Sequence, residues 1–278
     1  MLGNEELRSI KVNKRACIII PIYNENPIES EVMSISRNTS VLCDYDIYAV
    51  HPESMSLQKY KDYGFTQFVA FSDNYFKSNK SYSRLILSEE FYQPFLEYEY
   101  MLIAQTDTLI LNTEYTLDQF MDKGYDYWGA PWPKGPFDEP YGPREWFKSI
   151  FVHKPHELHV GNGGFTLRKV STSYELVKKH RLYIKYLWRL NEDLFFSTRA
   201  RAGEMVPHTL DMEKTADAKH VKYTSAPDSE ASQFALETNM QEEIDKGNIP
   251  YAVHAWEKHY KGGCEQVDLN KFCHHVKR

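Results

Sequence analysis

The stretch Tyr98-Glu-Tyr-Met-Leu-Ile-Ala-Gln-Thr-Asp107 decides the fold. Residues 100–104 form a short apolar run that predicts a buried strand, and the polar residues 105–107 end it. A carboxylate at the end of such a strand suits a divalent cation that bridges two phosphates, because Mg²⁺ and Mn²⁺ prefer oxygen ligands. The alternative is an ordinary Asp in a strand-to-turn loop, and Asp107 taken alone fits that alternative better.

Upstream of this stretch, strand and helix patterns alternate. Apolar, β-branched runs predict strands over residues 16–22, 46–50 and 66–71, and helical spacing predicts helices over 28–42, 54–63 and 82–95. This alternation predicts an α/β fold with a mainly parallel sheet and right-handed crossovers. In such sheets ligands bind beyond the carboxyl ends of the strands, which here are residues 23–24, 51, 72–73 and 105–107.

After residue 125 the alternation of strand and helix patterns ends. Pro/Gly/aromatic loops are expected over residues 129–136 and 140–143, and a mobile lid over residues 133–158. A Gly-rich segment over 160–168 leads into a strand. Helices are expected over 169–187 and 192–201, with Asn191 as N-cap, and a last strand over 250–254. Because no repeat or linker is visible, residues 1–278 are expected to form a single domain. Its parts would be a nucleotide-binding half at 16–110, a donor-sugar and acceptor half at 111–258, and a tail at 259–278.

Three further groups could carry chemistry, and each has a structural alternative. Gly161-Asn-Gly-Gly164 would let backbone amides approach a ligand, or would form a tight turn. Glu192 and Asp193 could supply a base, although acids at a helix start are also stabilised by the helix dipole. His254 could complete a metal site with Asp107, or could be a hydrogen-bonded structural residue.

Composition bounds the function. The 278 residues carry a formal charge of −6, which argues weakly against binding to nucleic acid or to an anionic membrane. Residues 1–15 lack the apolar region of a signal peptide, and no apolar run is long enough to span a bilayer. We therefore expect a cytoplasmic chain with free thiols, for which peripheral membrane association stays open. Cys264, Cys273, His274 and His275 match no standard zinc template.

Aromatic residues make up 14% of the chain, with 20 Tyr. A Tyr-rich core and surface explains this composition better than a carbohydrate site does. Trp128, Trp132 and Trp256 would either stack on a sugar face or pack inside the protein.

The order of several motifs resembles one family. The motifs are Tyr98–Asp107, Gly124-Tyr-Asp-Tyr-Trp-Gly-Ala-Pro-Trp132, Val160-Gly-Asn-Gly-Gly-Phe-Thr-Leu-Arg-Lys169 and Asn191-Glu-Asp-Leu-Phe-Phe-Ser197. Residues 21–23 and 251–256 fit the same pattern. Together they resemble DUF5672, a bacterial family expected to be glycosyltransferases, over roughly residues 16–258. The resemblance implies the GT-A fold, a Rossmann-like mixed sheet flanked by helices.

The resemblance also implies roles for individual residues. Nucleotide and donor contacts would come from Pro21, Ile22, Tyr23, Asn24, Ser81, Tyr82, Arg84, Gln105, Thr106, Gly163 and Gly164. Asp107 resembles the last Asp of the DxD motif, and His254 the late metal-ligand histidine. Asp193 would be the catalytic base, and Glu192 would hold the acceptor.

One departure affects the expected cofactor. Gln105 stands at the first position of DxD, so the site has one charge less than the pattern requires. A divalent cation, Mn²⁺ or Mg²⁺, is still expected, and Arg84, Arg168 or Lys258 would share its neutralising role.

The resulting hypothesis is a glycosyltransferase that moves a sugar from a UDP-sugar to a hydroxyl of a glycan or glycoprotein, with inversion; a retaining reaction stays open. The alternative is a non-catalytic nucleotide-sugar or carbohydrate-binding module derived from a transferase. A phosphoester hydrolase or nucleotidyltransferase would need more clustered acids or a nucleophile motif, and we find neither.

Overall fold

The computed structural model describes residues 14–63, 65, 67–132, 160–207 and 220–259. The expected lid at 133–158 and the Cys/His group beyond residue 259 lie outside the described residues. Within the described ranges, no helix combines the length and the apolar character that crossing a membrane requires.

A mixed six-stranded sheet forms the centre of the molecule, in the order β3-β2-β1-β4-β7-β6. The first four strands of this order run parallel, whereas β7 is antiparallel to both β4 and β6. The mainly parallel α/β sheet predicted from the sequence is therefore confirmed. The six strands are β1 (Lys14–Pro21), β2 (Asp46–Pro52), β3 (Gln67–Phe71), β4 (Tyr98–Ala104), β6 (Tyr127–Pro131) and β7 (Val160–Lys169).

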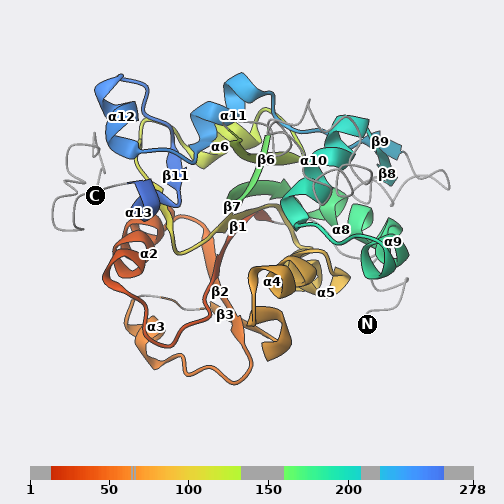
Figure 1. Cartoon of the computed structure of the whole chain (residues 1–278), viewed down its shortest axis with the longest axis horizontal. Coiled ribbons are helices and arrows are strands. Elements are labelled where there is room, and N and C mark those ends of the chain that lie inside the picture. Colours follow the sequence, from red (N-terminus) through yellow and green to blue (C-terminus); the bar gives the residue numbers. More distant parts are fainter. Residues whose placement is uncertain (1–13, 64, 66, 133–159, 208–219, 260–278) are drawn as a thin grey trace, which may run out of the picture.

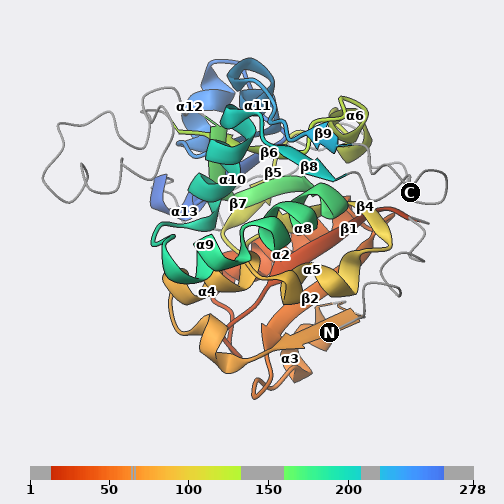
Figure 2. The ribbon, with the colours of Figure 1, turned by 90° about the vertical axis from the view of Figure 1, so that its right-hand side faces the viewer.

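Helices cover both faces of this sheet. Figure 1 shows α2 and α3 on one side of β1–β3 and α4 and α5 on the other, and Figure 2 shows α8 crossing the sheet on the side of α4 and α5. The helices are α2 (Glu29–Val41), α3 (Gln58–Asp62), α4 (Asn79–Ile86), α5 (Glu89–Tyr92), α6 (Leu117–Met121), α8 (Val170–Lys179), α9 (Arg181–Tyr186), α10 (Glu192–Ala202), α11 (Asp228–Phe234), α12 (Met240–Asp245) and α13 (Trp256–His259), with 3₁₀ turns η1 (Asp73–Phe76) and η2 (Gln93–Phe95).

Burial of both faces explains why the strands are apolar throughout. On β1, Cys17 and Ile19 pack with α4, α5 and α8, while Ile18 and Ile20 pack with α2 and α3. Successive side chains of a strand point to opposite faces. A strand that is covered on both faces therefore carries apolar residues at every position, whereas a half-exposed strand alternates apolar and polar residues.

Two predicted helices are interrupted. The helix expected over 82–95 is divided into α4, α5 and η2, because the Ser88 side chain accepts the Phe91 N–H at 3.2 Å and starts a new helix. The helix expected over 169–187 is divided into α8 and α9 at His180. The Gly-rich segment at 160–168 is part of strand β7 itself.

The register between β1 and β4 brings their carboxyl ends together at the edge of the sheet where a ligand is expected to bind. Ile19 pairs with Ile103, so residues 22–24 and 105–107 leave the sheet side by side. The Gln105 N–H donates to the Gly164 carbonyl at 2.9 Å, which adds β7 to the same edge.

A second, three-stranded sheet lies beside this edge, in the order β10-β11-β5. Its strands are β10 (Ala235–Leu236), β11 (Ala252–His254) and β5 (Thr108–Ile110); a separate pair joins β8 (Met205–Pro207) to β9 (His220–Lys222). The buried side chain of Asn38, on α2, holds β5 in place. Its amide donates to the Thr108 carbonyl at 2.8 Å and accepts the Ile110 N–H at 3.0 Å.

We predict that Asn38→Ala lowers the free energy of unfolding by about 2–4 kcal/mol, because it leaves a buried N–H and a buried carbonyl of β5 without their partner. Chemical denaturation would measure the change. Gln58→Ala, which removes an exposed amide from α3, should change it by less than about 0.5 kcal/mol. Equal effects of the two substitutions would contradict the anchoring role of Asn38.

Candidate functional site

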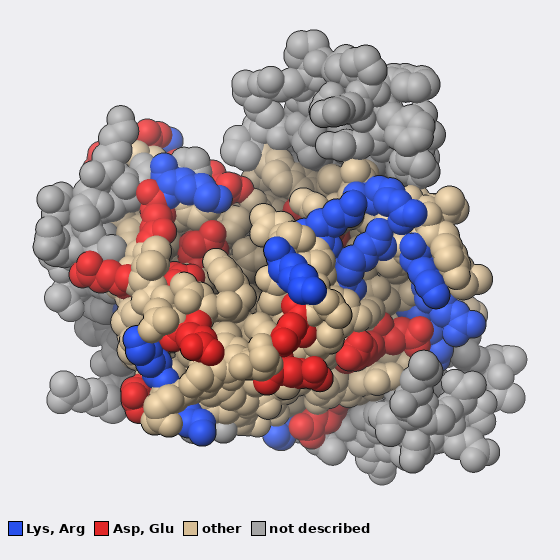
Figure 3. Space-filling model, turned by 60° about the horizontal axis from the view of Figure 1, so that its bottom comes forward, with Lys and Arg blue, Asp and Glu red and all other residues tan. Residues whose placement is uncertain are grey.

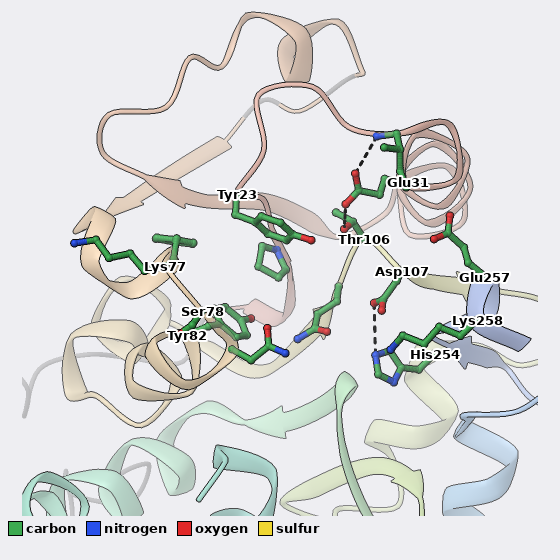
Figure 4. A pocket seen from close by; sticks show the side chains of 15 residues that line it. Tyr23, Glu31, Lys77, Ser78, Tyr82, Thr106, Asp107, His254, Glu257 and Lys258 are labelled. Carbon is green, nitrogen blue, oxygen red and sulfur yellow. Dashed lines mark hydrogen bonds and ion pairs between the residues drawn. The ribbon is translucent and has the colours of Figure 1, made fainter. Parts of the chain in front are cut away.

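A cleft with a volume of about 650 Å³ opens at the predicted edge of the sheet. Figure 4 shows its two walls, with Tyr23 and Tyr82 on one side and Asp107, His254 and Lys258 on the other. The cleft is lined by Pro21, Tyr23, Ile28, Glu31, Phe76, Lys77, Ser78, Asn79, Tyr82, Gln105, Thr106, Asp107, His254, Glu257 and Lys258.

Asp107 and His254 meet because β5 pairs with β11. Antiparallel register sets His254 opposite Thr108, one residue beyond Asp107. His254 Nε2 lies 3.5 Å from Asp107 Oδ1 (Figure 4). Burial raises the pKa of Asp107, but the interaction with the His254 side chain outweighs burial and lowers that pKa. Burial lowers the pKa of His254, yet its interactions with Asp107 and Glu237 raise it to about 9.

The other ring nitrogen of His254 faces a residue that sequence reasoning missed. Nδ1 lies 3.7 Å from Glu237 Oε2, and the same carboxylate accepts a hydrogen bond from the Asn162 side chain. The two nitrogens of the ring thus meet Asp107 and Glu237. Glu237 follows β10 in a polar segment without a recognisable motif, so its position could not be read from the sequence.

Gly164 and Gly163 permit this packing. A Cβ on Gly164 would lie 2.1 Å from the His254 ring, and a Cβ on Gly163 would lie 2.8 Å from Glu192 Oε1. The two glycines therefore let His254 and Glu192 rest directly on the β7 backbone. This packing is a different role from the predicted one of lining a donor sugar.

Glu192 and Asp193 begin α10 beside the same glycines. Glu192 is buried and accepts a hydrogen bond from the Ser83 hydroxyl, whereas Asp193 is half-buried and accepts the Leu194 N–H at 2.7 Å. Burial, followed by the negative charge of Glu192, raises the pKa of Asp193 well above that of an ordinary carboxyl. Asn191 is the N-cap residue as predicted, although its side chain caps no backbone N–H.

The opposite wall is aromatic. The Tyr23 side chain is 64% exposed at the mouth of the cleft. The Tyr82 hydroxyl is buried and has no hydrogen-bond partner among the described residues. An exposed ring and an unpartnered hydroxyl in one cleft offer a stacking surface and a hydrogen bond to a ligand.

Six predicted ligand contacts do not line the cleft: Gly163 and Gly164, described above, and Ile22, Asn24, Ser81 and Arg84. Ile22 is fully buried in the core, and the Asn24 side chain accepts the Asn26 N–H at 3.0 Å. Ser81 closes the capping box of α4, and it is Ser78, its partner there, that lines the cleft. Arg84 donates to the carbonyls of Ile184 and Trp188 at the end of α9.

The remaining predicted residues have defined partners. Thr106 lines the cleft, but its hydroxyl donates to Glu31 Oε1 at 2.8 Å. Lys258 lines the cleft, whereas Arg168 is fully buried between the rings of Tyr127 and Phe196. Trp128 and Trp256 are packed in the interior, at 0% and 1% exposed, so they do not stack on a ligand.

The described residues include no group of three or more His, Cys, Asp or Glu side chains placed to hold a metal ion. Asp107 and His254 supply two ligands of suitable chemistry, and Asp107 Oδ1 is a buried oxygen without a hydrogen-bond partner in the described part of the chain. This pair fits a cation whose other ligands come from phosphate oxygens and water. Glu237 faces the other ring nitrogen and would orient the histidine rather than bind the same ion.

We predict that Gly164→Ala displaces His254. The backbone fixes the position of the new Cβ, so the 2.1 Å contact with the His254 ring is relieved only if the ring moves. An NMR titration in metal-free buffer should give His254 a pKa of about 9 in the original protein. In the variant the value should move toward about 6.5, as the ring leaves its carboxylate neighbours. Gly247→Ala, where the new Cβ meets open space, should leave the His254 titration unchanged. An unchanged titration in Gly164→Ala would contradict this packing.

Comparisons with known proteins agree with the fold. The family model described as "Protein of unknown function (DUF5672)" matches residues 65–254. A search of the curated proteins finds no match. The galactosyltransferase LgtC, solved with donor and acceptor sugar analogs, superposes with a TM-score of 0.51 at 11% identity, over 92% of this chain and 93% of that one.

Two further structures show weaker similarity. The WbbM bifunctional glycosyltransferase gives a TM-score of 0.48 at 12% identity over 90% of this chain, which spans only 46% of that one. The mannosyltransferase Ktr4p from S. cerevisiae gives 0.43 at 12% identity, over 66% of this chain and 65% of that one. The family match covers more than half of the sequence, so the chain belongs to the DUF5672 family, and its fold is that of the GT-A glycosyltransferases.

Proposed function

We propose that this protein is a glycosyltransferase that uses a nucleotide-diphosphate sugar, with UDP as the favoured nucleotide. The observation that carries the proposal is the Asp107–His254 pair, which lies in a 650 Å³ cleft at the carboxyl ends of the parallel strands. The carboxylate of Asp193, with its raised pKa, lies close to the same β7 glycines. A site for diphosphate and a base near it are the two parts that sugar transfer requires.

The donor would lie across the cleft. The exposed ring of Tyr23 offers a face for the nucleobase, and Pro21 lies in the same lining. The diphosphate would then reach Asp107, His254 and Lys258 on the opposite wall (Figure 4). Tyr82, with its unpartnered hydroxyl, and Gln105 would meet the phosphates or the sugar between the two walls.

A Mn²⁺ or Mg²⁺ ion held by Asp107 and His254 would offset the charge that develops on the departing diphosphate. Glu237 would keep the His254 ring in the orientation that presents Nε2 to this site. An acid at the first DxD position would be a second carboxylate near Lys258. Because Gln105 stands there instead, the positive charge of Lys258 would act on the phosphates.

Asp193 would act as the base. It would take the proton of an acceptor hydroxyl while that oxygen bonds to the anomeric carbon and the bond from this carbon to the diphosphate oxygen breaks. The products would be the glycosylated acceptor and the nucleoside diphosphate, with the proton on Asp193, and the reaction would invert the anomeric centre. The acceptor would be a glycan or a glycoprotein.

The first test is thermal unfolding with UDP, GDP, CMP and TDP, with and without Mn²⁺. A ligand that binds only the folded state raises Tm, by about 5 °C or more at a hundredfold excess over Kd for a chain of this size. We expect a UDP-selective rise that Mn²⁺ enlarges and that Asp107→Asn removes. Asp62→Asn, an exposed acid on α3, should keep the full rise. No rise with any nucleotide would contradict the proposal.

We expect Asp193→Asn to lower the rate of sugar transfer from a UDP-sugar by about 10²–10⁴-fold while the UDP-induced rise in Tm persists. Asp228→Asn, which removes an exposed acid from the first turn of α11, tests whether loss of a helix-dipole contact alone has this effect. A UDP-release assay, run over a panel of glycan acceptors, measures the rate. Near-normal transfer by the Asp193→Asn variant would contradict the assignment of Asp193 as the base.

The pH dependence follows from the raised pKa of Asp193. The base must be ionised, so activity should rise with pH. Because an ordinary Asp carboxyl has a pKa of about 3.9, the acidic limb of kcat/KM should lie well above pH 4. Asp193→Asn should abolish this limb. A limb at about pH 4 in the original protein would show that another group is titrating.

A non-catalytic binding module is the second candidate, and Gln105 at the first DxD position is the observation that favours it. Such a module would give the UDP-induced rise in Tm, but neither transfer nor donor hydrolysis would follow. The same two assays therefore separate the candidates.

A further inference from the structure

The segment that joins α8 to α10 presents apolar side chains to solvent. Ile184 and Trp188 face the core at 5% and 0% exposed. Leu182, Tyr186 and Leu187 point outward, and their exposed fractions are 62%, 58% and 55%. Large apolar side chains are among the residues least often left in water, so three of them on one six-residue helix and its C-terminal cap mark an interaction surface.

Cations surround these apolar side chains. Arg181, Lys185 and Arg189 are exposed on the same segment, and among the described residues none of the three forms an ion pair. Lys185 lies over the ring of Tyr186, with its Nζ 5.2 Å from the ring centroid. Figure 3 shows Lys and Arg side chains gathered on one side of the molecule, beside an acidic band.

Two arginines fix the shape of this surface. Arg84 donates to the carbonyls of Ile184 and Trp188, and Arg189 donates to the carbonyl of Tyr186 at 2.7 Å, so the open end of α9 is capped by guanidinium groups. Burial and then the positive charge of Arg189 lower the pKa of Arg84. The fold thus holds like charges close together without an acidic partner for Arg189 in the described part of the chain.

A second cavity, of about 540 Å³, opens beside α9. Three of its lining residues are the cations Arg84, Arg181 and Lys185, and Glu89 is the acid in its wall. The cavity is separate from the Asp107–His254 cleft and shares no lining residue with it. Its excess of positive charge is suited to a phosphate group.

We propose that the α9 surface, formed by Arg181, Leu182, Lys185, Tyr186, Leu187 and Arg189, docks on an anionic phospholipid bilayer. Leu182, Tyr186 and Leu187 enter the interfacial layer, and the cations meet lipid phosphates, with the 540 Å³ cavity receiving a headgroup. Apolar anchors flanked by basic residues are the combination that holds a helix in the plane of a membrane surface.

The net charge of the chain does not oppose this docking. The formal charge of −6 would repel an anionic bilayer if it were spread evenly. Membrane attraction acts within about a Debye length, about 8 Å at physiological salt, so the local charge of the docked face decides it.

Flotation with lipid vesicles tests the proposal on the full chain. We expect binding to vesicles of equimolar phosphatidylglycerol and phosphatidylcholine, weak binding to phosphatidylcholine alone, and loss of binding as NaCl rises. The double substitution Arg181→Gln/Lys185→Gln should weaken binding by at least about tenfold, at about 1 kcal/mol for each cation near the surface. Leu182→Ser/Leu187→Ser should weaken it to a similar degree.

The double substitution Lys59→Gln/Lys61→Gln is the matched control, since it removes the same charge from the exposed face of α3. It should bind vesicles as the original chain does. Equal loss in this control, or equal binding to both kinds of vesicle, would overturn the proposal. Binding to heparin without binding to vesicles would also overturn it, because the surface would then recognise a soluble polyanion.

The result is independent of the catalytic proposal, since the UDP-induced rise in Tm reports the cleft and vesicle binding reports α9. An unchanged Tm without ligand verifies that each variant is folded. If the Leu182/Leu187 variant does not fold, the Arg181/Lys185 variant, whose side chains are exposed, decides the outcome.

Discussion

The antiparallel pairing of β5 with β11 is the constraint on which the candidate site depends. Backbone hydrogen bonds fix His254 opposite Thr108, and Asp107 precedes Thr108 in the chain. Two residues that are far apart in sequence thereby reach a separation of 3.5 Å. The pairing is itself held by α2, whose Asn38 and Arg37 bond the carbonyls of residues 108, 110 and 111. The site thus rests on backbone geometry and on buried polar contacts, which side-chain mobility cannot easily disturb.

Strand β7 is the platform on which the remaining parts assemble. Its glycines allow His254 to approach from β11 and Glu192 from α10, and its Gly164 carbonyl accepts the Gln105 N–H from the end of β4. Three segments therefore converge on a few residues of one strand. Burial of Asp193 there, followed by the negative charge of Glu192, raises the pKa of Asp193, so the same packing that builds the site also affects this carboxylate.

The sequence was sufficient for the four parallel strands and for the edge where the cleft opens, because both depend on local patterns. It did not reveal β6, whose residues Tyr127–Pro131 overlap a stretch expected to be a Pro/Gly/aromatic loop. Continuous apolar runs mark strands buried on two faces, and the polar residues that end them mark the edge. Tyr23, Gln105 and Asp107 line the cleft for this reason.

Long-range packing explains what the sequence did not reveal. Arg84 and Tyr82 lie on the same short helix, but Arg84 turns to the carbonyls of α9, which no local pattern indicates. Ser81 is used within its own helix turn, and Glu237 acquires a role only because β11 brings His254 to it. A residue's partner across the fold, rather than its neighbours in the chain, decides these cases.

The α9 surface and the carboxylate pair are parts of one continuous structure. Trp188 closes α9 against the core, and its indole N–H donates to the Asn191 carbonyl at 3.2 Å, immediately before Glu192. Ser83 bonds Glu192 while Arg84, the next residue, bonds the end of α9. A bilayer bound at α9 would therefore be coupled through two short connections to Glu192 and to Asp193, the proposed base. On this arrangement, docking would set the orientation of the catalytic edge relative to the membrane surface, and acceptors carried on that surface would approach from the side of α10.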